Sequence, residues 1–287
     1  MGRITARWPI TKVSVGESCA ARVDVLAVEE PLEIRVAGEP LVVTMRTPGH
    51  DVELAAGFLV SEGIIARGDQ FHAAIHCGGP GSGGGENTYN VLDVSLTADV
   101  GPLGRKHARS FYATSSCGVC GKASIDAVHT VSAFTLTGDE TVVDASRIAE
   151  LPDALRAAQT VFDKTGGLHA AGLFDAVAGD LLALREDVGR HNAVDKVIGW
   201  ALLNDRLPLR GTVLQVSGRA SFELVQKAVM AGIPMLTAVS APSSLAVRLA
   251  RDSGLTLVGF LRGQTMNVYT HPQRIDNPLN LRVRALT

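Results

Sequence analysis

The sequence predicts an α/β protein of two domains, a smaller N-terminal α+β domain and a C-terminal α/β domain whose sheet has helices on both faces. Three observations support this fold class. The 287 residues suffice for two domains of ordinary size, and 46% of them are apolar. The last third alternates continuous apolar runs with amphipathic helical runs. That alternation is typical of βαβαβ units, whose parallel strands are buried on both faces.

The predicted N-terminal domain spans residues 1–110 and contains a β-hairpin over residues 32–45, where apolar and polar side chains alternate. A helix is expected over residues 51–63, with acidic side chains in its first turn, where the helix dipole favours them. A strand is expected over residues 90–96. The glycine-rich run 78–85 is typical of a flexible loop.

The predicted C-terminal domain spans residues 111–287, and we place the boundary before it within residues 106–116. Its expected helices cover residues 145–162, a stretch from 192 onward, 221–231 and 244–252. Its expected strands cover residues 170–175, 181–186, 212–216, 235–239 and 256–260. The last three strands, with helices between them, predict a parallel sheet covered on both faces.

Charge is unevenly distributed along the chain. Residues 1–205 hold 17 basic and 26 acidic side chains, whereas residues 206–287 hold 10 and 3. The C-terminal part therefore suits an anionic small ligand. Its basic residues are scattered without an aromatic stripe, which argues against nucleic acid as a partner. No apolar stretch reaches the roughly 18 residues of a membrane span and no secretory signal is visible, so we expect a cytoplasmic protein.

The pair Cys117 and Cys120 is the sharpest local feature. Four cysteines are too few for the disulfide scaffold of a secreted protein of this length, so free thiols are expected. Gly118 and Gly121 let the loop bend, and Lys122 favours a thiolate. A thiolate can attack the outer sulfur of a donor persulfide and keep it as Cys–S–SH. The second thiol can then relay or release that sulfur.

Three other interpretations of the cysteine pair stay open. A zinc site needs four ligands, but the chain has no second Cys-x-x-C, and the other candidate ligands are His72, His76 and Cys77. A thioredoxin-type redox pair needs a βαβ pattern around it, which is missing. The third interpretation is an inert structural pair. The spacing favours reactive thiols without excluding these alternatives.

The loops after the predicted parallel strands form a candidate ligand site, because open α/β sheets bind ligands at the carboxyl ends of their strands. Ser217 with Arg219, Ser240, and the loop 261–265 follow three such strands. Free backbone N–H groups at helix starts can bind phosphate, and Arg219 and Arg262 add charge suited to a pyrophosphate. Ordinary N-capping explains the serines at 221 and 244 equally well. No G-x-G-x-x-G or P-loop motif is present, which disfavours NAD binding and ATP hydrolysis.

A run of alternating acids and bases, residues 185–196, marks a strand-to-helix junction. An ion-paired helix start capped by Asp187 or Asn192 is the interpretation favoured by the local sequence. His191 is also a candidate acid–base group or anion donor. His169 is a weaker candidate, because such histidines are more often structural.

Several ordered motifs cover most of the chain. They are Pro48–Asp51, Ala56–Ile65, Cys117–Gly121, Thr165–Ala171, Glu186–Lys196, Ser217–Lys227 and Tyr269–Pro272. Together they resemble the formate dehydrogenase accessory sulfurtransferases, the FdhD family. The glycine-rich run 78–85 touches none of these motifs, and Cys19 and Cys77 fall outside them.

The resemblance implies a two-domain homodimer whose C-terminal domain has a cytidine-deaminase-like sheet and which holds no metal of its own. It implies that the protein accepts sulfur from a cysteine desulfurase and passes it to bis-molybdopterin guanine dinucleotide, the cofactor of the client formate dehydrogenase. By the same resemblance Cys117 carries the persulfide and Cys120 assists. The residues implied to contact the guanine dinucleotide are Phe260, Leu261, Arg262, Gly263, Gln264 and Thr265.

Two hypotheses of other classes compete with a sulfurtransferase. A chaperone could bind and hand on the molybdenum cofactor without sulfur chemistry. A zinc deaminase is suggested by the fold analogy alone, and its pattern needs His-x-Glu before the cysteines. The nearest candidates, His50 and Glu53, have the wrong spacing.

Overall fold

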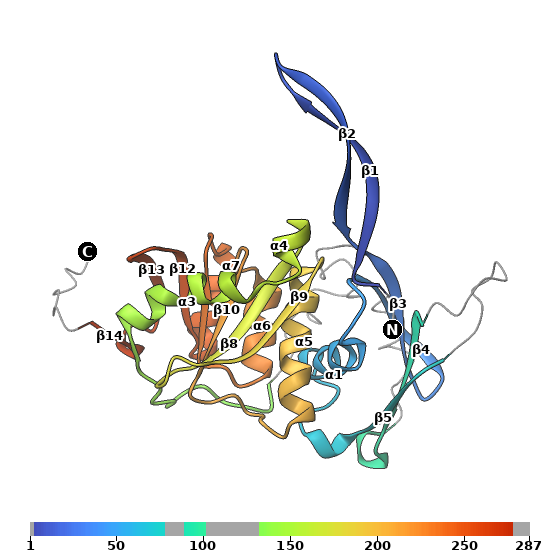
Figure 1. Ribbon diagram of the computed structural model, residues 1–287. Helices are drawn as coiled ribbons and strands as arrows, with labels where there is room; N and C mark the ends of the chain where they lie inside the picture. Colours follow the sequence, from blue (N-terminus) through green and yellow to red (C-terminus); the bar gives the residue numbers. More distant parts are fainter. Residues whose placement is uncertain (1–2, 78–88, 102–131, 278–287) are drawn as a thin grey trace.

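The computed structural model describes residues 3–77, 89–101 and 132–277 (Figure 1). The predicted domain boundary at 106–116, the glycine-rich run 78–85, and Cys117 and Cys120 lie outside these residues. The described strands form one sheet of six, one of four, and two of two strands. No helix within the described ranges is long and apolar enough to cross a membrane.

The N-terminal part of the chain contains the four-stranded sheet, in the order β4-β3-β6-β5. The predicted hairpin is confirmed as β3 (Glu30–Val36) and β4 (Glu39–Arg46), and the predicted third strand as β6 (Val91–Leu96). The sequence analysis did not assign β5 (Phe71–His76). Alternate side chains of β3 and β6 are buried against the predicted helix, α1 (Asp51–Ser61).

The C-terminal part contains the six-stranded sheet, in the order β13-β12-β11-β10-β8-β9. The predicted parallel unit is confirmed, because β10 (Thr212–Val216), β11 (Met235–Ala238) and β12 (Thr256–Arg262) run parallel. The sheet continues beyond this unit with strands whose direction the sequence analysis did not predict. Antiparallel strands extend both sides: β8 (His169–Asp175), β9 (Leu181–Asp187) and β13 (Thr265–Thr270).

Helices cover both faces of the six-stranded sheet, as predicted. One face packs against α3 (Ala145–Ala158), whose buried leucines and isoleucine contact Phe174 and other core side chains. The other face packs against α5 (Arg190–Leu203), α6 (Phe222–Met230) and α7 (Ser244–Ser253). The predicted helix 145–162 is shorter than expected, because α3 ends at Ala158 and a separate short helix, α4 (Phe162–Thr165), follows.

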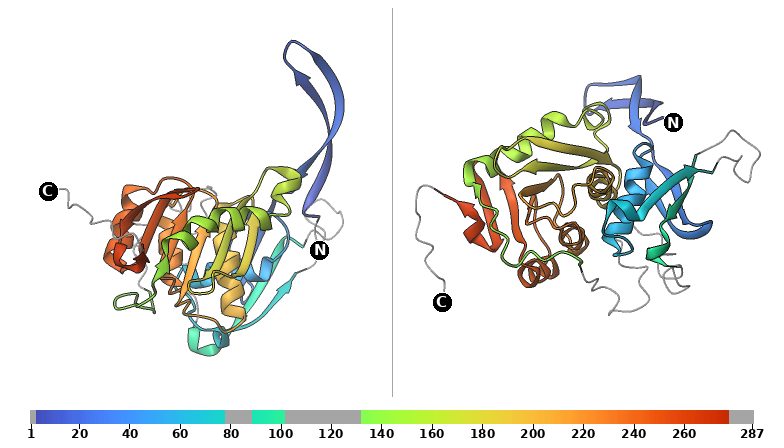
Figure 2. Two further views of the ribbon diagram at one scale, coloured as in Figure 1. Left: turned by 60° about the vertical axis from the view of Figure 1, so that its left-hand side comes forward. Right: turned by 90° about the horizontal axis from the view of Figure 1, so that it is seen from below.

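The two large sheets share one hydrophobic core. Helices α1 and α5 lie side by side between them (Figure 2). The buried cluster runs from Ile34 of β3 and Leu59 of α1 through Val197 of α5 to Leu214 of β10. The packing of α1 on α5 therefore joins the N-terminal part to the face of the six-stranded sheet that α5 covers.

A long β-hairpin, β1 (Thr5–Ser14) and β2 (Ser18–Ala27), projects from the body of the molecule (Figure 1). The sequence analysis assigned no structure to this segment. Neither strand has a buried face: Trp8 is 60% exposed and Val23 is 66% exposed. Two remaining short strands, β7 (Val143–Asp144) and β14 (Ile275–Asp276), pair with each other.

Candidate ligand site at the carboxyl edge of the six-stranded sheet

The segments that the sequence singled out meet at one edge of the six-stranded sheet. Strands β10, β11 and β12 end there, because they are parallel. The antiparallel strand β8 begins there, since Ala171 pairs with Val216 near the end of β10. Its partner β9 ends there, since His169 pairs with Asp187. This carboxyl edge is where open α/β sheets bind ligands.

The loop after β10 contains Ser217, which links two strands, and Arg219, which is exposed. The Ser217 hydroxyl accepts a hydrogen bond from Ala170 N at 2.9 Å, and Ser217 N donates to Ala170 O at 3.0 Å. Ser217 therefore joins the end of β10 to the start of β8. Arg219 is exposed and forms no hydrogen bond or ion pair with any residue of the described ranges. Its charge is available to a ligand.

The loop after β11 packs closely against the end of β12. Phe260 N donates to Ser240 O at 3.2 Å, and Arg262 Nε donates to Val239 O at 3.1 Å. A Cβ on Gly259 would lie 2.9 Å from Pro242 Cδ and 3.1 Å from Ser240 O, so a larger residue would push this loop away from β12. Ser240 and Arg262 therefore share one surface, as the sequence analysis expected.

Residues 260–265 form the tip of a hairpin between β12 and β13, not a free strand-end loop. Phe260 has a φ of 51° and is 40% exposed, a conformation that bulky residues rarely adopt. The Leu261 side chain is fully buried in the core, so only its backbone can face a ligand. Gly263 and Gln264 form the exposed turn, and Thr265 opens β13 with its hydroxyl donating to Arg262 O at 3.1 Å.

Two histidines and an arginine lie at the other end of the same edge. His169 opens β8, and Arg190 and His191 open α5. His191 Nε2 lies 3.4 Å from Ser221 Oγ and 3.7 Å from Glu223 Oε2. Burial alone would raise the pKa of Glu223, but the hydrogen bonds from His191, its own backbone and Ser221 lower it to about 2.

The helix caps differ from the sequence expectation. Gly189 is the N-cap of α5, rather than Asp187 or Asn192. Ser221 is the N-cap position of α6, but its hydroxyl makes no capping hydrogen bond and faces His191 instead. The hydroxyl that caps α7 belongs to Ser243 and accepts from Ala246 N at 3.2 Å, so the cap lies one residue before the predicted 244.

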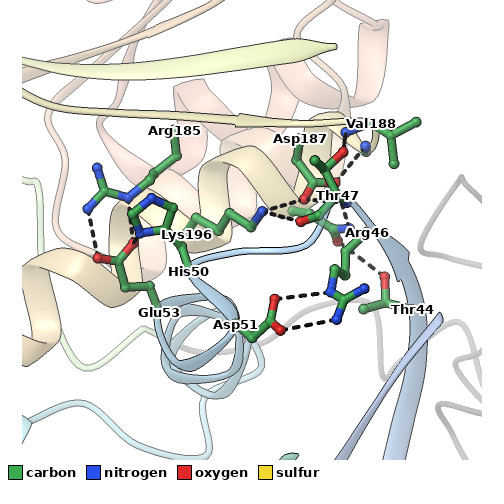
Figure 3. A network of polar contacts seen from close by, with 12 residues as sticks. Thr44, Arg46, Thr47, His50, Asp51, Glu53, Arg185, Asp187, Val188 and Lys196 are labelled. Atoms are coloured by element: carbon green, nitrogen blue, oxygen red, sulfur yellow. Dashed lines mark hydrogen bonds and ion pairs between the residues drawn. The ribbon is translucent and has the colours of Figure 1, made fainter. Parts of the chain in front are cut away.

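Most other polar residues of the run 185–196 stabilise the fold (Figure 3). The Asp187 carboxylate is fully buried, lies 2.7 Å from Lys196 Nζ, and accepts from Thr47 N at 3.1 Å and from Gly189 N at 2.8 Å. Lys196 Nζ also donates to Thr47 O at 2.9 Å. Asp195 pairs in the same way with Lys227, whose Nζ lies 2.8 Å from both carboxylate oxygens. The favoured interpretation of an ion-paired junction is confirmed for these residues. Arg190 and His191, at the start of α5, take no part in these two pairs.

The residues of the deaminase hypothesis are also paired with each other. His50 Nδ1 lies 3.1 Å from Glu53 Oε2, and Arg185 donates to both oxygens of Glu53. In the parts of the chain that the structure describes, no group of three or more His, Cys, Asp or Glu side chains is arranged to hold a metal ion.

The model of the FdhD/NarQ family matches residues 27–276. The chain belongs to this family.

A sulfur carrier protein FdhD of Mycolicibacterium paratuberculosis is 59% identical over 273 residues, which cover 95% of this chain and 99% of the relative. The protein of the same name from Streptomyces avermitilis is 57% identical over 276 residues, covering 96% and 97%. A crystal structure from Desulfotalea psychrophila, assigned as a formate dehydrogenase accessory protein, is 23% identical with a TM-score of 0.73, and the match covers 96% of this chain and all of that one. The mixed α/β fold is thereby confirmed.

Arg190 is the site residue of this FdhD/NarQ family member that sequence reasoning missed. It stands inside the singled-out run, between Gly189 and His191, but nothing in the sequence separates it from its ion-paired neighbours. Its place two residues before the predicted helix start at 192 was a partial signal, because backbone N–H groups at a helix start favour anions. His169, predicted as the weaker candidate, lies near enough that the charges of Arg190 and His191 lower its pKa together with burial.

A pH-dependent contribution to stability is expected from Glu53. Burial alone would raise its pKa, but hydrogen bonds from Arg185 and His50 lower it to about 2 from its ordinary 4.5. The ion pair therefore stabilises the folded state fully above about pH 4.5, and the contribution is lost as the pH falls from there towards 2. The free energy of unfolding of Glu53→Gln should lie below that of the parent at pH 7. The difference between the two free energies of unfolding should become smaller below pH 4.5. A difference that stays constant down to pH 3 would contradict this assignment.

Proposed function

We propose that this chain is a sulfur carrier for the maturation of formate dehydrogenase, and that it acts in the cytoplasm as a homodimer. Relatives named sulfur carrier protein FdhD match nearly the whole chain, and Cys117 and Cys120 give it a pair of thiols suited to sulfur chemistry. The observation that carries the proposal is the carboxyl edge, where Arg219, Arg262 and the exposed Phe260 lie on the loops after the parallel strands, and where the N-cap of α6, Ser221, makes no capping hydrogen bond. Such an edge suits a large nucleotide-like ligand.

The proposed sulfur donor is a cysteine desulfurase carrying a persulfide. The Cys117 thiolate attacks the outer sulfur of that persulfide, the donor's S–S bond breaks, and the donor cysteine leaves as a thiolate. Cys117 then holds the sulfur as Cys–S–SH. Attack by the Cys120 thiolate on the inner sulfur forms a Cys117–Cys120 disulfide and releases hydrosulfide for the acceptor. A thiol reductant must restore the pair before the next cycle.

The proposed acceptor is bis-molybdopterin guanine dinucleotide, bound as a substrate. The exposed ring of Phe260 supports this acceptor, because an exposed aromatic side chain can stack on an aromatic base. Arg219 and Arg262 can neutralise phosphate charge beside it. Within the proposed function, this edge holds the cofactor while the two cysteines deliver the sulfur.

Intact-protein mass spectrometry tests the proposal. After incubation with a cysteine desulfurase and free cysteine, we expect the parent to gain one sulfur that a reductant removes. Cys117→Ala should gain none, because it lacks the accepting thiol. Cys77→Ala and Cys19→Ala are matched controls, since both of these cysteines are exposed free thiols, and both variants should load normally. If the parent gains no sulfur, or Cys117→Ala loads like the parent, sulfur transfer through Cys117 is excluded and a cofactor-binding chaperone replaces it.

A further inference from the structure

The projecting hairpin of β1 and β2 has little of the described chain to stabilise it (Figure 1). It forms a sheet of two strands, and no other described strand pairs with either of its edges. Its apolar side chains face water: Val13 is 61% exposed, and Val15 at the tip is 96% exposed. A two-stranded hairpin alone is at best marginally stable in water, whereas three or more strands with an apolar face are stable. The hairpin therefore calls for further strands beside it.

The hydrogen bonds at the base of the hairpin determine which backbone groups face outward. Val28 N donates to Ile4 O at 2.9 Å, so these two residues form a hydrogen-bonded pair. In an antiparallel ladder every second pair is hydrogen-bonded, and the residues between turn their N–H groups away from the partner strand. The register of β1 and β2 therefore directs the N–H groups of Val23 and Val25 away from β1. In agreement with this, Val25 N donates to the side chain of Asp24 at 2.9 Å.

The two edges of the hairpin differ in their ability to accept another strand. Pro9 lies opposite Val23, at one of the outward-facing positions of β1, and it has no N–H to donate. Strand β2 contains neither proline nor lysine, the residues that commonly protect an exposed edge. The edge of β1 is therefore protected against pairing, whereas the edge of β2 is open to it.

We propose that β2 pairs antiparallel with β2 of a second copy of this chain, around a two-fold axis at Val23. Such an axis places one residue opposite itself. With Val23 at the axis, Arg22 of each chain lies opposite Asp24 of the other, and opposite charges in a cross-strand pair attract. An axis at Arg22 or at Asp24 would instead bring like charges together. This inference rests on the homodimer of the proposed function and names its interface.

The pairing accounts for the other features of the hairpin. It joins two marginal hairpins into one sheet of four strands, in the order β1-β2-β2-β1. Because the two β2 strands run antiparallel, the tip of each hairpin, with Val13 and Val15, lies beside the base of the other. Pro9 then lies on both outer edges of the new sheet, where it hinders the addition of further chains. The assembly therefore closes at two copies.

Sedimentation equilibrium of the full chain tests the interface. We expect the parent to be a dimer. Val23→Pro removes an N–H that faces away from β1, so it removes no hydrogen bond within the hairpin. It should raise the dissociation constant of the dimer about tenfold or more, because the two-fold axis makes the loss occur twice. Thr11→Pro is the matched control, since Thr11 occupies an outward-facing position of β1, and it should dimerise like the parent.

Charge reversal separates a lost interface from a damaged hairpin. Arg22→Asp places two pairs of carboxylates opposite each other across the interface, and Asp24→Arg does the same with guanidinium groups. Each single variant should weaken the dimer about tenfold, because like charges directly opposite each other destabilise a strand pair. The double variant Arg22→Asp with Asp24→Arg restores opposite charges and should dimerise nearly as well as the parent. A hairpin that had merely misfolded would not recover in this way.

Three results would each overturn the interface. They are a monomeric parent, a dimer that is as stable in Val23→Pro as in the parent, and a double variant no better than the single ones. The loading of sulfur onto Cys117 is measured separately, by mass spectrometry. If loading fails while the dimer behaves as expected, the sulfur carrier is refuted and the interface stands. If loading succeeds while the dimer persists in Val23→Pro, the proposed function stands and the two copies meet through another surface.

Discussion

Gly57→Ala should destabilise the protein by about 3 kcal/mol, although alanine is normally the better helix residue by roughly 1 kcal/mol. Gly57 lies in α1 where this helix crosses α5, and a Cβ added to it would lie 1.8 Å from Asp195 O. Gly199 of α5 is its counterpart, because a Cβ there would lie 1.8 Å from Glu53 O. The two helix backbones touch, and no side-chain rotation can relieve the clash. The helices must move apart, which opens the core between the two sheets.

Urea unfolding measures this effect. Gly57→Ala and Gly199→Ala should both lose about 3 kcal/mol of the free energy of unfolding. Gly167→Ala is the control, because a Cβ at that position would meet its nearest atom at 3.6 Å, an ordinary contact. The control should stay within about 0.5 kcal/mol of the parent. If all three variants unfold alike, the close crossing of α1 and α5 is not what holds the two sheets together.

Local pattern was sufficient to predict those parts of the fold that burial dictates. The strands at 212–216 and 235–239 are continuous apolar runs because helices cover both of their faces, and the structure places them as β10 and β11. The hairpin over 32–45 alternates because only one of its faces is buried against α1. In both cases the buried positions must be apolar, so the spacing of apolar residues along the sequence indicates the element.

The missed elements lack such a period. Strands β1 and β2 are mostly exposed, and β13 lies at the edge of its sheet with only Thr270 fully buried. These strands are held by backbone hydrogen bonds to a partner strand. Backbone hydrogen bonds place few demands on side-chain type, so the sequence shows no clear pattern there. The sequence also left open how β8 runs relative to β10. Strands joined by a tight turn must be antiparallel to each other, but that turn does not determine which of them pairs with the parallel unit, or in which direction.

The candidate site was predictable where topology alone decides it. Parallel strands bring Arg219, Ser240 and Arg262 to one edge whatever their side chains contact. The roles of Asp187 and Arg190 were not predictable in the same way. The contact between Asp187 and Thr47 joins residues 140 positions apart. Among the described residues, the buried Nε of Arg190 has no hydrogen-bond partner, which a sequence does not show.

Lys196→Met is expected to destabilise the protein by about 3–5 kcal/mol, because it leaves a buried carboxylate without its counter-charge. Lys196 is 1% exposed, and its Nζ lies 2.7 Å from Asp187 Oδ2. The same ammonium donates to Thr47 O, so the variant also leaves a carbonyl without its donor. Lys164→Met is the control, since Lys164 is exposed, and it should change the free energy of unfolding by about 0.5 kcal/mol at most.

The effect of Lys196→Met should depend on pH in a defined direction. Burial raises the pKa of Asp187, and the charge of Lys196 opposes that rise. Without Lys196 the pKa rises further, so the folded state favours the protonated acid and loses stability as the pH increases through that value. The loss measured by urea unfolding should therefore be larger at pH 8 than at pH 5. Adding Asp187→Asn should recover part of it, because the buried charge is then gone. A loss below 1 kcal/mol at both pH values would show that the Asp187–Lys196 pair is not needed to hold Thr47 against the start of α5.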